Sequence, residues 1–256
     1  MIELALAIIV LLAVLAIAAQ ARRERFGLEH TVPVRSRVDG AAYRVVADMP
    51  DPRGAADRLA ALNARATCLL RSLRRRYGSP PANANSFANA NSFANANAFE
   101  FARSPRHAAA HKLLSRFNPD NFAENSPRDS TGDSSYCLDK GAVVAMCLRS
   151  RGPSRAGGAR GASQGAPRGR ARARAPPADE LHDPETLTFV MIHELAHIAV
   201  DDYDHPPEFW RTFKFLLAEA QLAGCYTSLD FAAAPVDYCG VHVGYNPLYD
   251  SELAMI

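Results

Sequence analysis

The chain has 256 residues, which leaves room for one catalytic domain with appendages. Its formal net charge of +2 is unevenly distributed, because eight arginines lie between residues 149 and 174. Without these eight, the chain has 21 basic and 27 acidic residues. The globular part is therefore mildly acidic, and one inserted loop is strongly basic. The five cysteines contain no CxxC pair, which argues against a cysteine-based metal site, and their irregular spacing predicts free thiols in a reducing compartment.

Residues 4–19 form an uninterrupted aliphatic run, which three arginines at positions 22, 23 and 25 follow. A run of this length is near the lower limit for spanning a bilayer. A cleaved signal peptide is the alternative, but Glu3 and the lack of positive charge ahead of the run disfavour it. We therefore predict a transmembrane anchor over residues 1–21 and a single-pass membrane protein, whose catalytic domain is on the cytosolic side because the positive charge follows the run.

Residues 30–256 are predicted to form one domain with two low-complexity inserts. Residues 82–99 repeat a hexapeptide three times (ANANSF, ANANSF, ANANAF), which is too few copies for a solenoid. Residues 150–178 are rich in Arg, Gly, Ala, Ser and Pro, a composition that cannot pack a core and should be disordered. Their arginines could bind nucleic acid or acidic lipid electrostatically, or the loop could be an expanded insert with no dedicated partner.

The remaining segments show both helical and strand patterns. Loose alternation over residues 34–47, with a turn at Asp39-Gly40, predicts two short strands. A long helix should begin at Asp51-Pro52 and end at Gly78, and another should begin at Ser104-Pro105.

A β-hairpin is predicted over residues 136–148, with Asp139-Lys140-Gly141 as its turn. The continuous apolar run over residues 142–148 predicts that the second strand is buried. The edge of that strand could pair with an extended substrate, or ordinary sheet pairing inside the domain could occupy it.

The segment His193-Glu194-Leu195-Ala196-His197 is an HExxH zinc signature. On a helix the side chains at positions i and i+4 lie on one face, so both imidazoles can reach one metal ion while Glu194 lies beside it. Asp183 as N-cap and Pro184 at the first helical position predict where the helix begins. Its faces are apolar nearly all round, which predicts burial, and buried histidines are costly unless a metal or hydrogen bonds within the core satisfy them.

Zinc in a catalytic site takes a third protein ligand and keeps a fourth position for water. We predict His205 for this role, because it lies eight residues after His197 in a loop stiffened by two prolines and because neutral imidazole suits zinc. A second helix should follow from Pro207 to Gln221, with Gly224 at its C′ position, and pack against the metal helix. The alternative third ligands are Asp201, Asp202, Asp204 and Glu219.

This order of helix, hairpin, metal helix, histidine loop and second helix resembles the zincin metallopeptidases. The HELAH segment, with a later histidine and Glu208-Phe209-Trp210, looks most like the WLM family and its SprT-like relatives, and closest to the WLM-like metallopeptidases of large DNA viruses and algae. The third histidine comes slightly later than in the type members. The matching stretches are residues 34–40, 118–120, 124–127, 139–141, 148–150, 181–183, 238–240 and 246–247.

The resemblance implies an α+β zincin fold, in which a small mixed sheet packs on the HExxH helix behind the N-terminal transmembrane helix. It implies a membrane-tethered peptidase that hydrolyses protein or peptide substrates, with Zn²⁺ held by His193, His197 and His205 and with Glu194 as general base. Two alternatives stay open: a DNA–protein crosslink type protease guided by the basic loop, and a non-catalytic, zinc-stabilised membrane scaffold whose metal four protein ligands would enclose. Candidates for stabilising the oxyanion are Tyr238, His242 and Tyr245.

Overall fold

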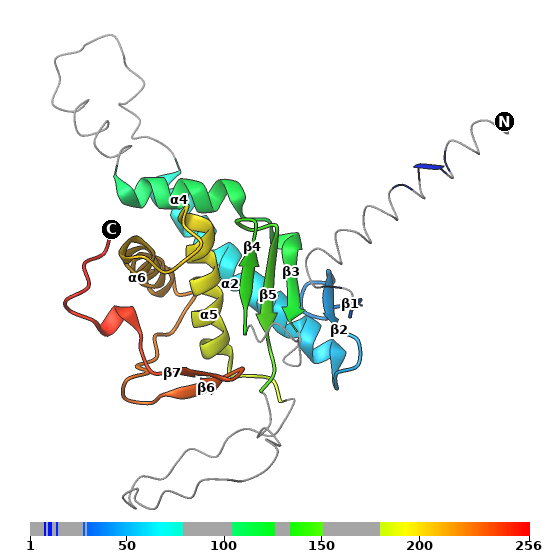
Figure 1. Cartoon of the computed structure of the whole chain (residues 1–256). Coiled ribbons are helices and arrows are strands. Elements are labelled where there is room, and N and C mark those ends of the chain that lie inside the picture. The colour runs from blue at the N-terminus through cyan, green and yellow to red at the C-terminus, as the bar shows by residue number, and fades with distance from the viewer. Residues whose placement is uncertain are drawn as a thin grey trace, which may run out of the picture.

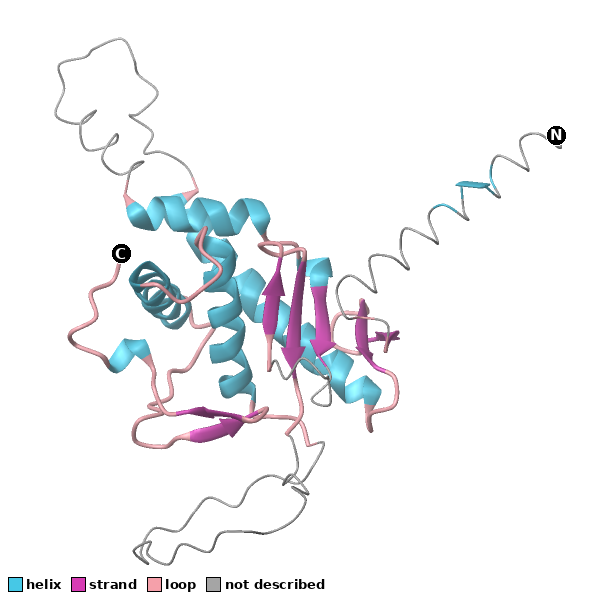
Figure 2. Cartoon of the chain, in the orientation of Figure 1, coloured by secondary structure: helices cyan, strands magenta, loops and turns pink. Residues whose placement is uncertain are grey.

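The computed structural model describes residues 30–78, 104–125, 134–150 and 180–256, together with residues 8, 10, 11, 14 and 28. These residues form an α+β domain in which helices pack on one face of a mixed five-stranded sheet, with a separate two-stranded hairpin beside them (Figures 1 and 2). The predicted insert at residues 82–99 lies outside the described residues, and so does all but the first residue of the predicted insert at 150–178. The suggested nucleic-acid contact of the arginine-rich loop falls on that second insert.

The sheet combines parallel and antiparallel pairs. Strands β1 and β2 are antiparallel, as are β5 and β4, whereas β2–β3 and β3–β5 are parallel. The hairpin predicted over residues 136–148 and the two strands predicted around Asp39-Gly40 are therefore confirmed, although the first of these strands begins earlier, at Thr31. Strand β3 is an element that the sequence did not predict. In order across the sheet the strands are β1 (Thr31–Arg35), β2 (Ala42–Val46), β3 (Phe122–Asn125), β5 (Val143–Cys147) and β4 (Tyr136–Leu138).

Strand β5 is buried on both faces, which explains its continuous apolar run. Val144 and Met146 belong to the main core under the helices, whereas Val143 and Ala145 belong to a smaller cluster on the other face. Because β5 lies between β3 and β4, both of its edges are paired. The suggestion that its edge receives a substrate is therefore wrong, and β4 is the strand at that end of the sheet.

Among the described residues, four α-helices surround the main core, and each begins where the sequence predicted. Asp51 caps α2 by accepting a hydrogen bond from the backbone N–H of Gly54 at 2.9 Å, and Ser104 caps α4 in the same way. Helices α2 and α5 pack against the sheet, and α4 and α6 pack against α2 and α5. Their bounds are α2 (Pro52–Tyr77), α4 (Pro105–Arg116), α5 (Pro184–Ala199) and α6 (Pro207–Leu222).

A further hairpin, which the sequence did not predict, lies near the beginning of α5 (Figure 1). Its strands β6 (Val236–Tyr238) and β7 (Val241–Val243) are antiparallel. Cys239 and Gly240 form the two-residue turn with φ values of 47° and 88°. Positive φ at both turn residues matches the right-handed twist of the flanking strands.

Two disulfides correct the prediction of free thiols. Cys68 on α2 is bonded to Cys225 after α6, and Cys147 at the end of β5 is bonded to Cys239 in the β6–β7 turn. The paired Cα atoms are 6.1 and 6.4 Å apart, within the range that a disulfide spans. Only Cys137 is a free thiol, so the inference of a reducing compartment loses its basis. The second disulfide ties the β6–β7 hairpin to the main sheet.

The prediction of an N-terminal transmembrane helix is wrong on this structure. Among the described residues, no helix combines the length and the apolar composition that crossing a bilayer requires. The single-pass membrane localisation with a cytosolic catalytic domain depended on that helix and is corrected with it. Of residues 1–21, only 8, 10, 11 and 14 are described.

Arg149 also differs from its prediction as the first arginine of the basic loop. Its side chain is 1% exposed and its Nε lies 2.7 Å from Oε1 of Glu124, whose side chain is fully buried. The other carboxylate oxygen of Glu124 accepts a hydrogen bond from the backbone N–H of Val46 at 2.9 Å. The ion pair thus joins the end of β5 to β3 and β2 inside the domain.

Candidate metal centre

Helix α5 carries the first part of the candidate site through the middle of the domain. Oδ2 of Asp183 accepts hydrogen bonds from the backbone N–H groups of Glu185 and Thr186, both at 2.9 Å, and Pro184 follows the cap. Arg65 of α2 donates to Glu185 at 2.7 Å. The predicted N-terminus is confirmed, and the helix is fixed to its neighbour near that end.

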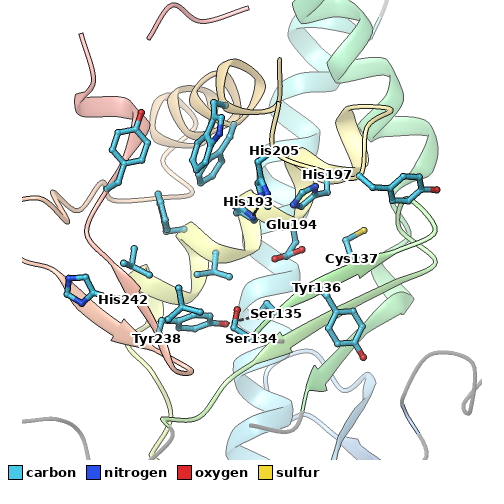
Figure 3. A pocket seen from close by; sticks show the side chains of 18 of the residues that line it. Ser134, Ser135, Tyr136, Cys137, His193, Glu194, His197, His205, Tyr238 and His242 are labelled. Atoms are coloured by element: carbon cyan, nitrogen blue, oxygen red, sulfur yellow. Dashed lines mark hydrogen bonds between the residues drawn. The ribbon is translucent and has the colours of Figure 1, made fainter. Parts of the chain in front are cut away.

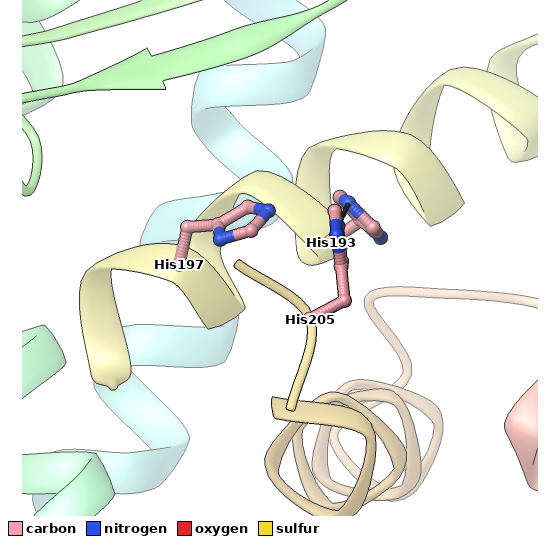
Figure 4. A group of neighbouring side chains, drawn as sticks. All are labelled: His193, His197 and His205. Carbon is pink, nitrogen blue, oxygen red and sulfur yellow. Dashed lines mark hydrogen bonds between the residues drawn. The ribbon is translucent and has the colours of Figure 1, made fainter. Parts of the chain in front are cut away.

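The imidazoles of His193, His197 and His205 converge (Figure 4). One nitrogen of each ring lies within 4.8 Å of the other two, and the Nε2 atoms of His193 and His205 are 3.0 Å apart. His193 and His197 are one turn apart on α5, and His205 reaches them from the loop that leads to α6. The structure therefore brings together the three residues that the sequence singled out as metal ligands.

Burial lowers the pKa of all three imidazoles, and repulsion by neighbouring histidines lowers it further for His193 and His197. Burial, and next the charges of His197 and His205, lower the pKa of His193 to about 3. Burial, then His205 and Lys140, lower the pKa of His197 to about 4, and burial also lowers the pKa of His205. Zinc binds the neutral form of imidazole, so three neutral rings with converging nitrogens fit a zinc ion.

Lys140 fixes the loop that carries His205. Its Nζ donates to the backbone oxygen of His197 at 3.0 Å and to that of Asp202 in the loop. The same ammonium lies 4.3 Å from the centre of the Tyr203 ring. A cation here also suits the negative end of the α5 dipole. The sequence predicted Lys140 only as a turn residue, and nothing in its local pattern signals this second role.

Two of the alternative third ligands, Asp201 and Glu219, have partners elsewhere. Asp201 pairs with Lys112 at 2.8 Å and with Arg116 at 2.9 Å, both on α4. Glu219 is buried on α6 and accepts a hydrogen bond from the Tyr77 hydroxyl at 2.9 Å. Within the described part of the chain, the histidine group includes none of Asp201, Asp202, Asp204 or Glu219.

Glu194 is only 4% exposed, yet it lines the same cavity as the histidines. Figure 3 shows its carboxylate between α5 and β4, close to His193 and His197 and on the side of Cys137. Burial, and next the charge of Glu194, raise the pKa of the Cys137 thiol to about 12. Cys137 is therefore protonated at neutral pH, which rules it out as a thiolate nucleophile.

The three candidates for stabilising an oxyanion all line the cavity, but each already has a partner. The Tyr238 hydroxyl donates to the backbone oxygen of Cys147 at 2.7 Å, and the Tyr245 hydroxyl donates to Asp250 at 2.7 Å. His242 Nδ1 lies 3.1 Å from Oδ1 of Asp237, at the margin of the cavity and away from the three histidines (Figure 3). These hydrogen bonds occupy the polar groups of all three residues within the protein, so none of the three is singled out as the residue that stabilises an oxyanion.

The cavity that contains the site has a volume of about 560 Å³. Its lining changes along α5, from His197 through His193 and Glu194 to Phe189 and Val190, which are successive turns of one helix face. On α5 itself the histidines and Glu194 therefore lie toward the C-terminal end of the cavity and the apolar side chains toward the N-terminal end, while Ser134, Ser135, Tyr238 and His242 line the cavity from other elements.

No protein-family model matches the chain, and no solved structure matches it. Over 118 residues the chain is 30% identical to Uncharacterized protein R325 of Acanthamoeba polyphaga mimivirus. The match covers 46% of this chain and 46% of that protein, so the chain spans about half the length of the curated relative that it matches. The relative's name states no activity, so the function must be argued from the site.

Proposed function

We propose that this chain is a zinc-dependent peptidase, in which His193, His197 and His205 hold the metal and Glu194 is the general base. The observation that carries the proposal is the convergence of three neutral imidazoles beside a buried carboxylate in one cavity. The likeness of the HELAH segment and its histidine loop to WLM and SprT-like zincins supports the same assignment, and we propose that relationship with it.

The chain's own residues supply the proton transfer and the orientation. When bound, Zn²⁺ would supply Lewis-acid chemistry that lowers the pKa of water and polarises a carbonyl group. Glu194 takes the proton of the attacking water and passes it to the leaving amine nitrogen. The rings of Phe209 and Phe213, whose centres are 4.8 and 5.2 Å from that of His193, hold this imidazole in place.

Strand β4 offers a way to present an extended polypeptide to Glu194. Among the described strands it is the last one on the side of the cavity, and its residues Tyr136 and Cys137 line that cavity. An extended substrate can add a strand to such an edge through main-chain hydrogen bonds. A peptide bond paired in this way would cross the space between β4 and α5, where Glu194 lies (Figure 3).

A structural zinc site is the competing interpretation, and the donor set disfavours it. Structural sites enclose the metal with four protein ligands, whereas catalytic sites leave one position free. In the described part of the chain, no fourth histidine, cysteine, aspartate or glutamate joins the three imidazoles. The site therefore suits catalysis better than a purely structural metal.

Hydrolysis of a denatured protein tests the proposal. The zinc-loaded full-length chain should cleave denatured casein, a zinc chelator should abolish cleavage, and added zinc should restore it. The control is the same chelator saturated with zinc before it is added, which should have no effect. Absence of cleavage by the zinc-loaded chain, or cleavage that the chelator leaves unchanged, would contradict the peptidase assignment.

A further inference from the structure

The cavity extends past the histidines along α5. Phe189 and Val190 lie one turn before His193 and Glu194, so they occupy the same helix face. Both line the cavity although they are only 6% and 8% exposed. They form an apolar floor directly beside the groups assigned to catalysis.

Helix α6 and the β6–β7 hairpin supply the walls around that floor. Trp210 and Phe213 line the cavity from α6. Along β7, Val241 and Val243 share one face because side chains alternate on a strand, and His242 between them, which also lines the cavity, pairs with Asp237 of β6. The apolar recess is defined here as Phe189, Val190, Trp210, Phe213, Val241 and Val243.

No side chain of the apolar recess carries a charge. The charged side chains assigned to the cavity, Glu194 and Lys140, belong to its metal-binding part. A charged substrate side chain among these six residues would lose water without gaining an oppositely charged partner from them, which is unfavourable. A large apolar side chain would instead bury its surface against aromatic rings and valines.

We propose that the apolar recess takes one large apolar side chain of the substrate, in a residue next to the peptide bond that is cleaved. The inference rests on the proposed peptidase function and adds the substrate class. Cleavage should therefore occur beside leucine, isoleucine, methionine or an aromatic residue, and not beside charged residues on that side of the bond.

The cleavage sites in a peptide library give the first test. The zinc-loaded full-length chain is incubated with peptides derived from a whole proteome, and the new termini are identified by mass spectrometry. One position flanking the cut should favour large apolar residues over Asp, Glu and Lys by at least about tenfold, the discrimination that a hydrophobic pocket achieves. Flanking positions that match the library composition, or that favour charged residues, would overturn the inference.

A charge placed in the apolar recess gives the second test. Val243→Lys should lower the preference for large apolar residues at least about tenfold and raise cleavage beside Asp and Glu. If Val243→Lys does not fold, Val241→Lys replaces it, because Val241 is 49% exposed and tolerates a polar side chain. The matched control is Val38→Lys, at a valine 58% exposed near the β1–β2 turn, which should keep the wild-type preference.

The outcomes separate the two proposals. If the wild-type chain cleaves peptides without an apolar preference, or both hairpin variants keep the wild-type preference, the apolar recess does not select the substrate and the peptidase assignment stands. If the wild-type chain cleaves nothing, both proposals fail.

Discussion

Replacing Glu194 with glutamine should lower kcat for peptide hydrolysis by about 10²- to 10⁴-fold, the usual contribution of a general base. The amide has nearly the shape of the carboxylate but cannot accept the proton of the attacking water. Glu194 does not belong to the group of residues that would hold the metal, which consists of three histidines, so zinc should stay bound at the wild-type stoichiometry. Steady-state kinetics on a peptide cut by the wild-type chain, with zinc content measured in parallel, gives both values.

The matched control for this variant is Glu252→Gln, at an exposed glutamate near the C-terminus. It removes the same charge at a distance from the cavity and should leave kcat unchanged. A Glu194→Gln variant with the wild-type kcat would show that another group takes the proton. Loss of zinc from that variant would instead place Glu194 among the groups that hold the metal.

Replacing Arg149 with methionine should lower the free energy of unfolding by about 3–5 kcal/mol, because it leaves the Glu124 carboxylate buried without its partner. Burial already raises the pKa of Glu124, and Arg149 is the strongest influence that lowers it, so the variant should raise this pKa further. A carboxyl group whose folded-state pKa exceeds its unfolded value destabilises the fold as pH rises through that interval. The deficit should therefore grow with pH.

Urea unfolding at several pH values measures this deficit. The matched control is Arg37→Met, which breaks the pair with Asp57 at an arginine that is 69% exposed and should cost no more than about 1 kcal/mol. The double variant Arg149→Met/Glu124→Gln should recover part of the loss, since no buried charge remains. An Arg149→Met deficit as small as that of the control would contradict the role given to this ion pair.

The sequence predicted the candidate site better than the parts of the fold around it. The HExxH spacing, the Asp183-Pro184 start and the position of His205 rest on local rules, and the structure brings the three histidines together as those rules require. The helix starts are local in the same sense. Each helix has a proline in its first turn, and α2, α4 and α5 also have a side-chain cap directly before it.

The elements that the sequence missed depend on distant partners. Strand β3 carries Glu124, which breaks the apolar pattern of a buried strand and is stable there only because Arg149 lies 25 residues further along the chain. The Cys147–Cys239 disulfide joins residues 92 positions apart, so spacing alone gave no sign of it. The transmembrane prediction failed for the opposite reason, because it relied on a local apolar run alone.

A zinc titration of the full-length chain tests most directly whether His193, His197 and His205 form one metal site. The wild-type chain should bind one zinc ion. Loss of a residue that only hydrogen-bonds to a metal ligand weakens metal binding roughly 10- to 100-fold, so His205→Ala, which removes a ligand itself, should weaken zinc binding by more than that. His242→Ala, which removes an imidazole at the cavity margin, should leave the affinity unchanged. A wild-type chain that stays metal-free at saturating zinc, or a His205→Ala variant with wild-type affinity, would contradict the account.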